Sequence, residues 1–371
     1  MGSNQTNSNT ELSLKLDRIR HLLDESDLDG ILLRRTDNFS WATCGADPHI
    51  NTADSMGIAS LLITQTDRFV VTNNIEAKRL MHEEGLAEGG WEFKASPWFE
   101  GDNQIVSLTR GMKLGADTSF PNALDLSGEI ASIRSQLTPE EDKRYRELGK
   151  LCAQGMRQAI DGVNPGMSEY EIASLLAQSV ESKGVQAVVN LIATDERIFS
   201  YRHPLPTVKK LQNYAMLILC GRKWGLICSV TRFVHFGALP DEIRHKANAV
   251  ARIDAEMINA TRPGRTLGDV FSKAQSAYAE AGYPDEWQLH HQGGSAGYAP
   301  REVTATPGTP EPILVGQAFA WNPSIAGTKS EDTILVGEGS NEIITEMADW
   351  PSIEVQVGKQ VIKRPAILEK V

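Results

Sequence analysis

The sequence predicts a mixed α/β protein with two domains, the second of which is built from two related halves. Its 371 residues exceed one ordinary domain and suit two. Helical and strand-like patterns alternate along the first third of the chain. Two closely similar helix starts then appear at positions 165 and 263, 98 residues apart. These three observations define the expected fold class.

The N-terminal domain is expected over residues 12–137, after a polar lead (residues 1–11) that we expect to be disordered. Leucine and isoleucine recur with helical spacing from Leu12, and the apolar run that starts at Gly30 is typical of a buried strand. Further strands are expected in three short apolar runs: residues 57–64, 68–71 and 113–115. Helix and strand in alternation predict a small α/β domain.

The second domain is expected to begin at Thr138 and to occupy residues 138–371. Thr138 is a good helix N-cap, Pro139 suits the first helical position, and acidic residues follow in the first turn. Such a strong helix start after a run of short elements marks the domain boundary.

The internal repeat consists of Pro-Gly, a Ser or Thr N-cap, an acid three residues later and a glycine at the helix end. The two copies carry these residues: Pro165, Ser168, Glu171 and Gly184, then Pro263, Thr266, Asp269 and Gly282. Each helix is followed by a histidine-bearing loop and two apolar runs. We therefore expect a pseudo-symmetric array of antiparallel strands covered by helices, with a site between the halves.

His203 is a candidate for proton transfer. The nearby prolines Pro204 and Pro206 stiffen its loop, and a histidine has a pKa close to neutral pH. A loop histidine bonded to backbone fits the same pattern equally well.

A second candidate segment is His290-His291 with the glycines that follow it. In an extended segment the two rings point to opposite sides, so we expect His291 to face the site and His290 to pack. Tyr298, Arg301 and Glu302 lie just beyond and could contact a substrate or form a solvated rim.

Glu331 and Asp332 stand at the entrance of an apolar strand, so alternation sends one of them inward. A buried carboxylate needs a cationic or hydrogen-bonding partner. Asn322 and Lys329 are polar neighbours in the same region.

Composition limits the possible partners. A net charge of −11 with scattered basic residues disfavours nucleic acid and anionic membrane surfaces. The four cysteines form no CxxC pair, and neither a signal peptide nor an apolar span is expected, which favours a cytoplasmic protein with free thiols. A small-molecule substrate is the expected partner.

These landmarks resemble the pita-bread family of creatinase, aminopeptidase P, prolidase and methionine aminopeptidase over about residues 138–345. The segment Asn38-Phe39-Ser40-Trp41 after a strand is similar to the N-terminal domain of creatinase and aminopeptidase P. The resemblance implies a pita-bread catalytic domain with a pseudo-twofold repeat, preceded by a smaller creatinase-type domain. It also implies a homodimer.

The metallopeptidases of this family bind two ions through two aspartates, one histidine and two glutamates. The resemblance assigns Leu219, Ser229 and Asn322 to three of the carboxylate positions, whereas His291 and Glu331 are retained. Tyr298 stands where those peptidases have a second histidine. One carboxylate and one imidazole cannot offset the charge of two divalent ions, so we expect neither metal nor another cofactor.

The resemblance to creatinase therefore implies a metal-independent hydrolase or lyase that acts on a C–N bond of a small amidino, ureido or N-acyl amino acid. His203 would be the acid and base, Glu331 would hold a cationic or NH-rich group, and His291 would polarise the reacting centre. The expected substrate contacts are Arg202, Ser229, Thr231, Arg232, Tyr298, Arg301, Glu302, Asn322 and Lys329. A non-catalytic binding protein and an Xaa-Pro metallopeptidase remain alternatives.

Overall fold

The computed structural model describes residues 2–370, with the backbone alone at residues 2–9. The chain divides into two compact units. The first runs to Glu141 and includes residues 224–226, and the second comprises residues 142–223 and the chain from Ile227 onward. Within the described residues, no helix combines the length and apolarity needed to cross a membrane.

The first unit is built on a six-stranded sheet with the order β4-β3-β2-β1-β5-β6. Its strands are β1 (Gly30–Arg35), β2 (Met56–Thr64), β3 (Arg68–Asn73), β4 (Glu92–Ser96), β5 (Leu114–Ala116) and β6 (Ala123–Asp125). Its helices are α1 (Gly2–Glu25), α2 (Thr36–Ala42), α3 (Ala77–His82), α4 (Asn103–Leu108) and α5 (Ser127–Arg134), with the 3-10 turn η1 (Trp98–Glu100). The expected α/β character and strands are confirmed.

Helix α1 begins at Gly2, ahead of the expected start at Leu12. The lead that we expected to be disordered is therefore helical from residue 2. It contains no proline, the residue that interrupts a helix most strongly.

The second unit contains a four-stranded sheet with the order β19-β9-β8-β7 and a five-stranded sheet with the order β11-β10-β12-β15-β16. The strands of these two sheets are β7 (Gln186–Thr194), β8 (Tyr214–Lys223), β9 (Leu226–Phe236), β10 (Gly293–Ala296), β11 (Val303–Thr304), β12 (Ala318–Trp321), β15 (Asp332–Val336), β16 (Asn341–Ile343) and β19 (Leu368–Lys370). Two hairpins add β13 (Ser324–Ile325), β14 (Thr328–Lys329), β17 (Ser352–Val357) and β18 (Gln360–Pro365).

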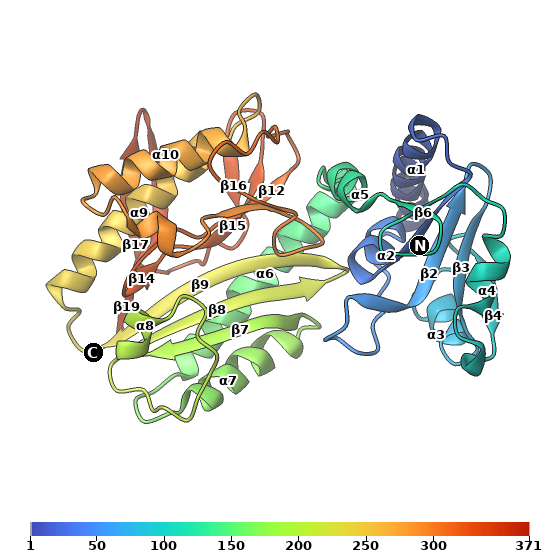
Figure 1. Cartoon of the computed structure of the whole chain (residues 1–371). Coiled ribbons are helices and arrows are strands. Elements are labelled where there is room, and N and C mark those ends of the chain that lie inside the picture. The colour runs from blue at the N-terminus through green and yellow to red at the C-terminus, as the bar shows by residue number, and fades with distance from the viewer. Residues whose placement is uncertain (1, 371) are drawn as a thin grey trace. The chain divides into compact units, whose positions relative to one another are not determined.

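Helices cover both sheets of this unit (Figure 1). They are α6 (Pro139–Gly162), α7 (Glu169–Glu181), α8 (Glu196–Ser200), α9 (Asp241–Ala260) and α10 (Leu267–Glu280), with the 3-10 turn η2 (Glu286–Leu289). A buried core that includes Val270, Phe271 and Trp321 joins α9 and α10 to the five-stranded sheet. This arrangement of strands inside and helices outside confirms the expected pita-bread architecture.

The helix starts form where the sequence predicts them. At α6, the backbone N–H of Thr138 donates to Oε2 of Glu141 at 2.7 Å, and the N–H of Glu141 donates to Oγ1 of Thr138 at 3.2 Å. The same reciprocal capping box occurs at α7 with Ser168 and at α10 with Thr266. Two donors that would otherwise lack partners are satisfied at each start.

The glycines before the two repeated helices also match. Gly166 has φ 90° and Gly264 has φ 85°, in the left-handed region that favours glycine. The local repeat inferred from the Pro-Gly starts is thus present in the backbone as well as in the caps.

Candidate functional site

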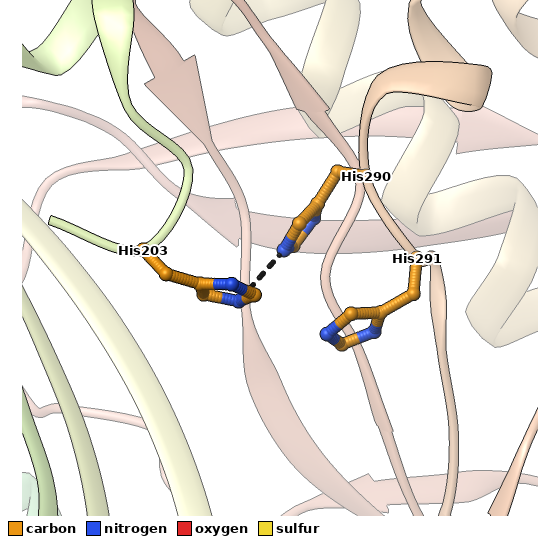
Figure 2. Close-up of side chains that lie close together, drawn as sticks. All are labelled: His203, His290 and His291. Carbon is orange, nitrogen blue, oxygen red and sulfur yellow. Dashed lines mark hydrogen bonds between the residues drawn. The ribbon is translucent and has the colours of Figure 1, made fainter.

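Three histidines of the second unit meet at one place (Figure 2). His203 lies in the loop after α8, and His290 and His291 lie between η2 and β10. Nε2 of His203 is 3.0 Å from Nε2 of His290, so one ring donates to the other. The ring centres of His290 and His291 are 4.4 Å apart, and those of His203 and His291 are 5.6 Å apart.

The expectation that His290 packs away from the site is wrong. Side chains alternate between opposite faces only in regular strands, and β10 does not begin until Gly293. The preceding irregular segment leaves both rings on the same side, with His290 buried and His291 exposed.

Glu169, the first residue of α7, anchors the loop that carries His203. Its buried carboxylate accepts hydrogen bonds from the backbone N–H of Thr194 at 2.9 Å and of Thr207 at 3.0 Å, and the guanidinium of Arg197 is bonded to it as well. Both ends of the segment between Arg197 and Thr207 are therefore tied to one side chain. The sequence offered no signal for this role beyond an acid in a helical first turn.

A second group of charged side chains gathers around Glu331. Lys329 places Nζ 2.7 Å from its Oε2, and Arg301 places Nη2 3.0 Å from its Oε1. The hydroxyl of Thr231 donates to Oε2 at 2.6 Å. Arg301 also reaches Oγ of Ser229, at 3.3 Å. Both oxygens of the Glu331 carboxylate are thus engaged by partners from this chain.

The surroundings lower the pKa values of the acid and of the imidazoles. Burial alone would raise the pKa of Glu331, but the neighbouring Lys329 and Arg301 lower it to about 2. Burial is the main cause that lowers the pKa of His290 to about 2 and of His291 to about 4, and the nearby cations add to it. The pKa of His203 is also lowered, by burial and then by Lys329. Glu331 is therefore ionised and the three imidazoles are neutral at neutral pH.

Asn322 lies beside this charged group. Trp321 pairs with Asp332 in the antiparallel ladder between β12 and β15, so the next pair in register brings Asn322 opposite Glu331. Asn322 is 2% exposed, and its Oδ1 has no hydrogen-bond partner among the described residues. A buried acceptor without a partner is costly, which makes it a candidate ligand contact.

Other expected substrate contacts have structural duties. Arg232 is 2% exposed and donates from Nη2 to Oδ1 of Asp332 at 2.7 Å, so its guanidinium holds a buried carboxylate of this chain. Strand alternation explains this, since Thr231 takes the face toward Glu331. Glu302 accepts the backbone N–H of Tyr298 at 2.8 Å and shapes the turn there.

Two further expected substrate contacts, Tyr298 and Arg202, differ in their exposure to solvent. Tyr298 is buried, with 2% exposure. Arg202 directly precedes His203 in the chain. It is partly exposed, and its Nη2 donates to Oε2 of Glu286 at 2.5 Å. Both remain predicted substrate contacts.

The comparison with protein families identifies the second unit. The family model of Metallopeptidase family M24 matches residues 143–338, more than half of the chain. The chain belongs to metallopeptidase family M24. Membership in this family supports a hydrolytic enzyme.

Relatives and solved structures agree with the M24 assignment. An uncharacterized peptidase of Staphylococcus epidermidis is 23% identical over 257 residues, which cover 66% of this chain and 72% of the relative. The fold is similar to that of an Xaa-Pro dipeptidase from Bacillus anthracis, with a TM-score of 0.78, 19% identity and coverage of 97% of this chain and 100% of the other. A prolidase from Pyrococcus horikoshii gives a TM-score of 0.77 at 18% identity, with coverage of 90% and 98%.

The dinuclear metal centre expected of an M24 peptidase does not fit these residues. Leu219, Ser229 and Asn322 supply no carboxylate at the three positions named by the resemblance. The remaining carboxylate, Glu331, has one oxygen bonded to Arg301 and the other to Lys329 and Thr231. Two divalent ions need several free anionic oxygens, and this group offers cations in their place.

Proposed function

We propose that this M24 protein is a metal-independent hydrolase that cleaves a C–N bond in a small amino acid derivative with a free carboxylate. N-acyl, ureido and amidino amino acids are the candidate substrates. The observation that carries the proposal is the double contact of Arg301 and Lys329 with Glu331, because it supplies buried positive charge where family peptidases hold metal ions.

The charges around Glu331 favour an anionic substrate. Two cationic side chains face one carboxylate, so the group keeps one net positive charge, and the neighbouring imidazoles are neutral. A substrate carboxylate would complete this charge balance. Glu331 has both oxygens engaged, which argues against our expectation that it holds a cationic substrate group.

His203 is the proposed acid and base. In this mechanism His203 takes a proton from water while the water oxygen bonds to the acyl, ureido or amidino carbon. The C–N bond then breaks, and His203 returns the proton to the departing nitrogen, so the net reaction consumes one water. His291 and the side chain of Asn322 would position the carbon that is attacked.

A substrate screen tests the proposal. Full-length protein freed of metal by a chelator is offered N-acyl, ureido and amidino amino acids, each paired with its carboxamide, and released amine or ammonia is measured. We expect turnover of a carboxylate form that exceeds that of its amide. Turnover that appears only with added manganese or cobalt, or with Xaa-Pro dipeptides alone, would instead establish a metallopeptidase.

Two matched variants locate the chemistry. His203→Gln should lower kcat by about 100-fold or more, because general acid–base catalysis contributes at least that much. His245→Gln, an exposed histidine of α9, serves as the control.

Arg301→Met should raise KM for the carboxylate substrate more than for its amide. Equal effects on both substrates would show that Arg301 does not bind the carboxylate.

A further inference from the structure

We propose that His203, His290 and His291 form a site for one divalent ion of the zinc class, with a ligand set that differs from that of the dinuclear centre of M24 peptidases. One ligand nitrogen from each ring lies within 4.8 Å of the others. Figure 2 shows the three rings facing a common space. Of these residues, the family resemblance assigns only His291 to metal binding.

The spacing is close to what such an ion requires. Zinc binds imidazole nitrogen at about 2.0–2.1 Å, which places the nitrogens of a tetrahedral site about 3.3 Å apart. The Nε2 atoms of His203 and His290 are already 3.0 Å apart. The ligand nitrogen of His291 lies within 4.8 Å of the other two, so it has to move closer to them to complete the site. His203 is exposed and lies outside helix and strand, so a rotation of its side chain can bring its ring nitrogen closer to His291 while the loop backbone stays in place.

The chemistry of the donors selects the ion. Three imidazoles without a carboxylate suit zinc, cobalt, nickel or copper and disfavour magnesium, calcium or manganese. Neutral rings do not have to release protons before they bind. The Nε2 atoms of His203 and His290 face each other, and the hydrogen bond between them uses the proton of one ring and the lone pair of the other. An ion between them would instead be bound by the lone pairs of both nitrogens, with each ring protonated on Nδ1.

The neighbouring cations determine the fourth ligand. Lys329 and Arg301 repel a bare divalent ion, so hydroxide or the carboxylate of a substrate is the expected fourth ligand. An ion bound to Nε2 of His203 also withdraws this ring from the proton transfer that the proposed function assigns to it. This consequence rests on the proposed function: zinc should silence the metal-independent reaction.

Calorimetry and spectroscopy test the site without reference to activity. Chelator-treated full-length protein is titrated with Zn²⁺, and with Co²⁺ while visible absorption is recorded. We expect one ion per chain and the intense absorption of four-coordinate cobalt. His290→Ala should weaken metal binding by more than about tenfold. Loss of a residue that only supports a ligand lowers metal affinity by about that much, and loss of the ligand itself should cost at least as much. His245→Ala is the control.

Several results would overturn the site. These are no binding of Zn²⁺ or Co²⁺ by the wild-type protein, an affinity in His245→Ala as low as that in His290→Ala, unchanged affinity in both His290→Ala and His203→Ala, or two ions per chain. The second variant changes an exposed loop residue, so the test survives if His290→Ala fails to fold. Absence of turnover in the metal-free protein would refute the proposed function and leave the binding test intact. Turnover that rises when zinc is added would refute the prediction that zinc inhibits the metal-independent reaction.

Discussion

The ammonium group of Lys329 lies 2.7 Å from Oε2 of Glu331, and both side chains are almost completely buried. Arg301 binds the opposite oxygen. We predict that Glu331→Gln destabilises the protein by about 3–5 kcal/mol, because it leaves buried cations without their anion. Urea unfolding measures this loss. Glu342→Gln, which breaks an exposed pair with Arg146, is the control and should cost less than about 1 kcal/mol.

The anchor at Glu169 makes a second prediction. Glu169→Gln should speed amide hydrogen exchange between Arg197 and Thr207, since the neutral amide loses the ion pair and one acceptor oxygen. Glu181→Gln, at the exposed end of α7, should leave exchange in that loop unchanged. If exchange in the loop is the same in both variants, Glu169 does not hold the His203 loop.

The same carboxylate gives a pH dependence. Burial by itself raises the pKa of Glu169, but the hydrogen bonds from Arg197 and the two threonines outweigh it and leave the pKa below its ordinary value of 4.5. The folded state therefore favours the ionised form, and Glu169 stabilises the protein above about pH 4.5. This stabilisation is lost as the pH falls through the lowered pKa. The stability difference between wild type and Glu169→Gln, measured by denaturant unfolding, should shrink across that range.

Arg364 supports β15, the strand that follows Glu331. It is 1% exposed and bonds Asp254 through Nε and Asp332 through Nη2, both at 2.8 Å. Arg364→Met should cost about 3–5 kcal/mol, because two buried carboxylates lose a shared partner. The adjacent Lys363→Met removes an exposed charge and should have little effect. Similar midpoints in urea for the two variants would contradict this assignment.

The repeated capping boxes allow a paired test. Ser168→Ala and Thr266→Ala should each lower the free energy of unfolding by about 1 kcal/mol, because each removes the acceptor for a backbone N–H at the third helical position. Denaturant unfolding of the single variants and of the double variant checks both size and additivity. A loss confined to one variant would show that the two starts are not equivalent in energy.

Local signals predicted most of the fold. The caps at Thr138, Ser168 and Thr266 depend on residues three positions apart, so the sequence alone suffices to place them. Four apolar runs of the N-terminal domain likewise located β1, β2, β3 and β5 to within a few residues.

The site was less predictable because its contacts are distant in sequence. Arg301 and Glu331 meet through the register of the five-stranded sheet, and the sequence does not specify that register. The direction of His290 depended on where β10 begins. The pairing of Arg232 with Asp332 was also not predictable, because an arginine beside a site residue can face either side of its strand.

The 98-residue offset pairs Glu169 with Leu267, each the first residue of its repeated helix. Leu267 belongs to the apolar core, whereas Glu169 anchors the loop that carries His203. The two copies of the helix start therefore serve different purposes at this position. An exchange of the two side chains should destabilise both halves. The two helix starts have the same capping box, but Leu267 packs in an apolar core and Glu169 accepts hydrogen bonds from a loop.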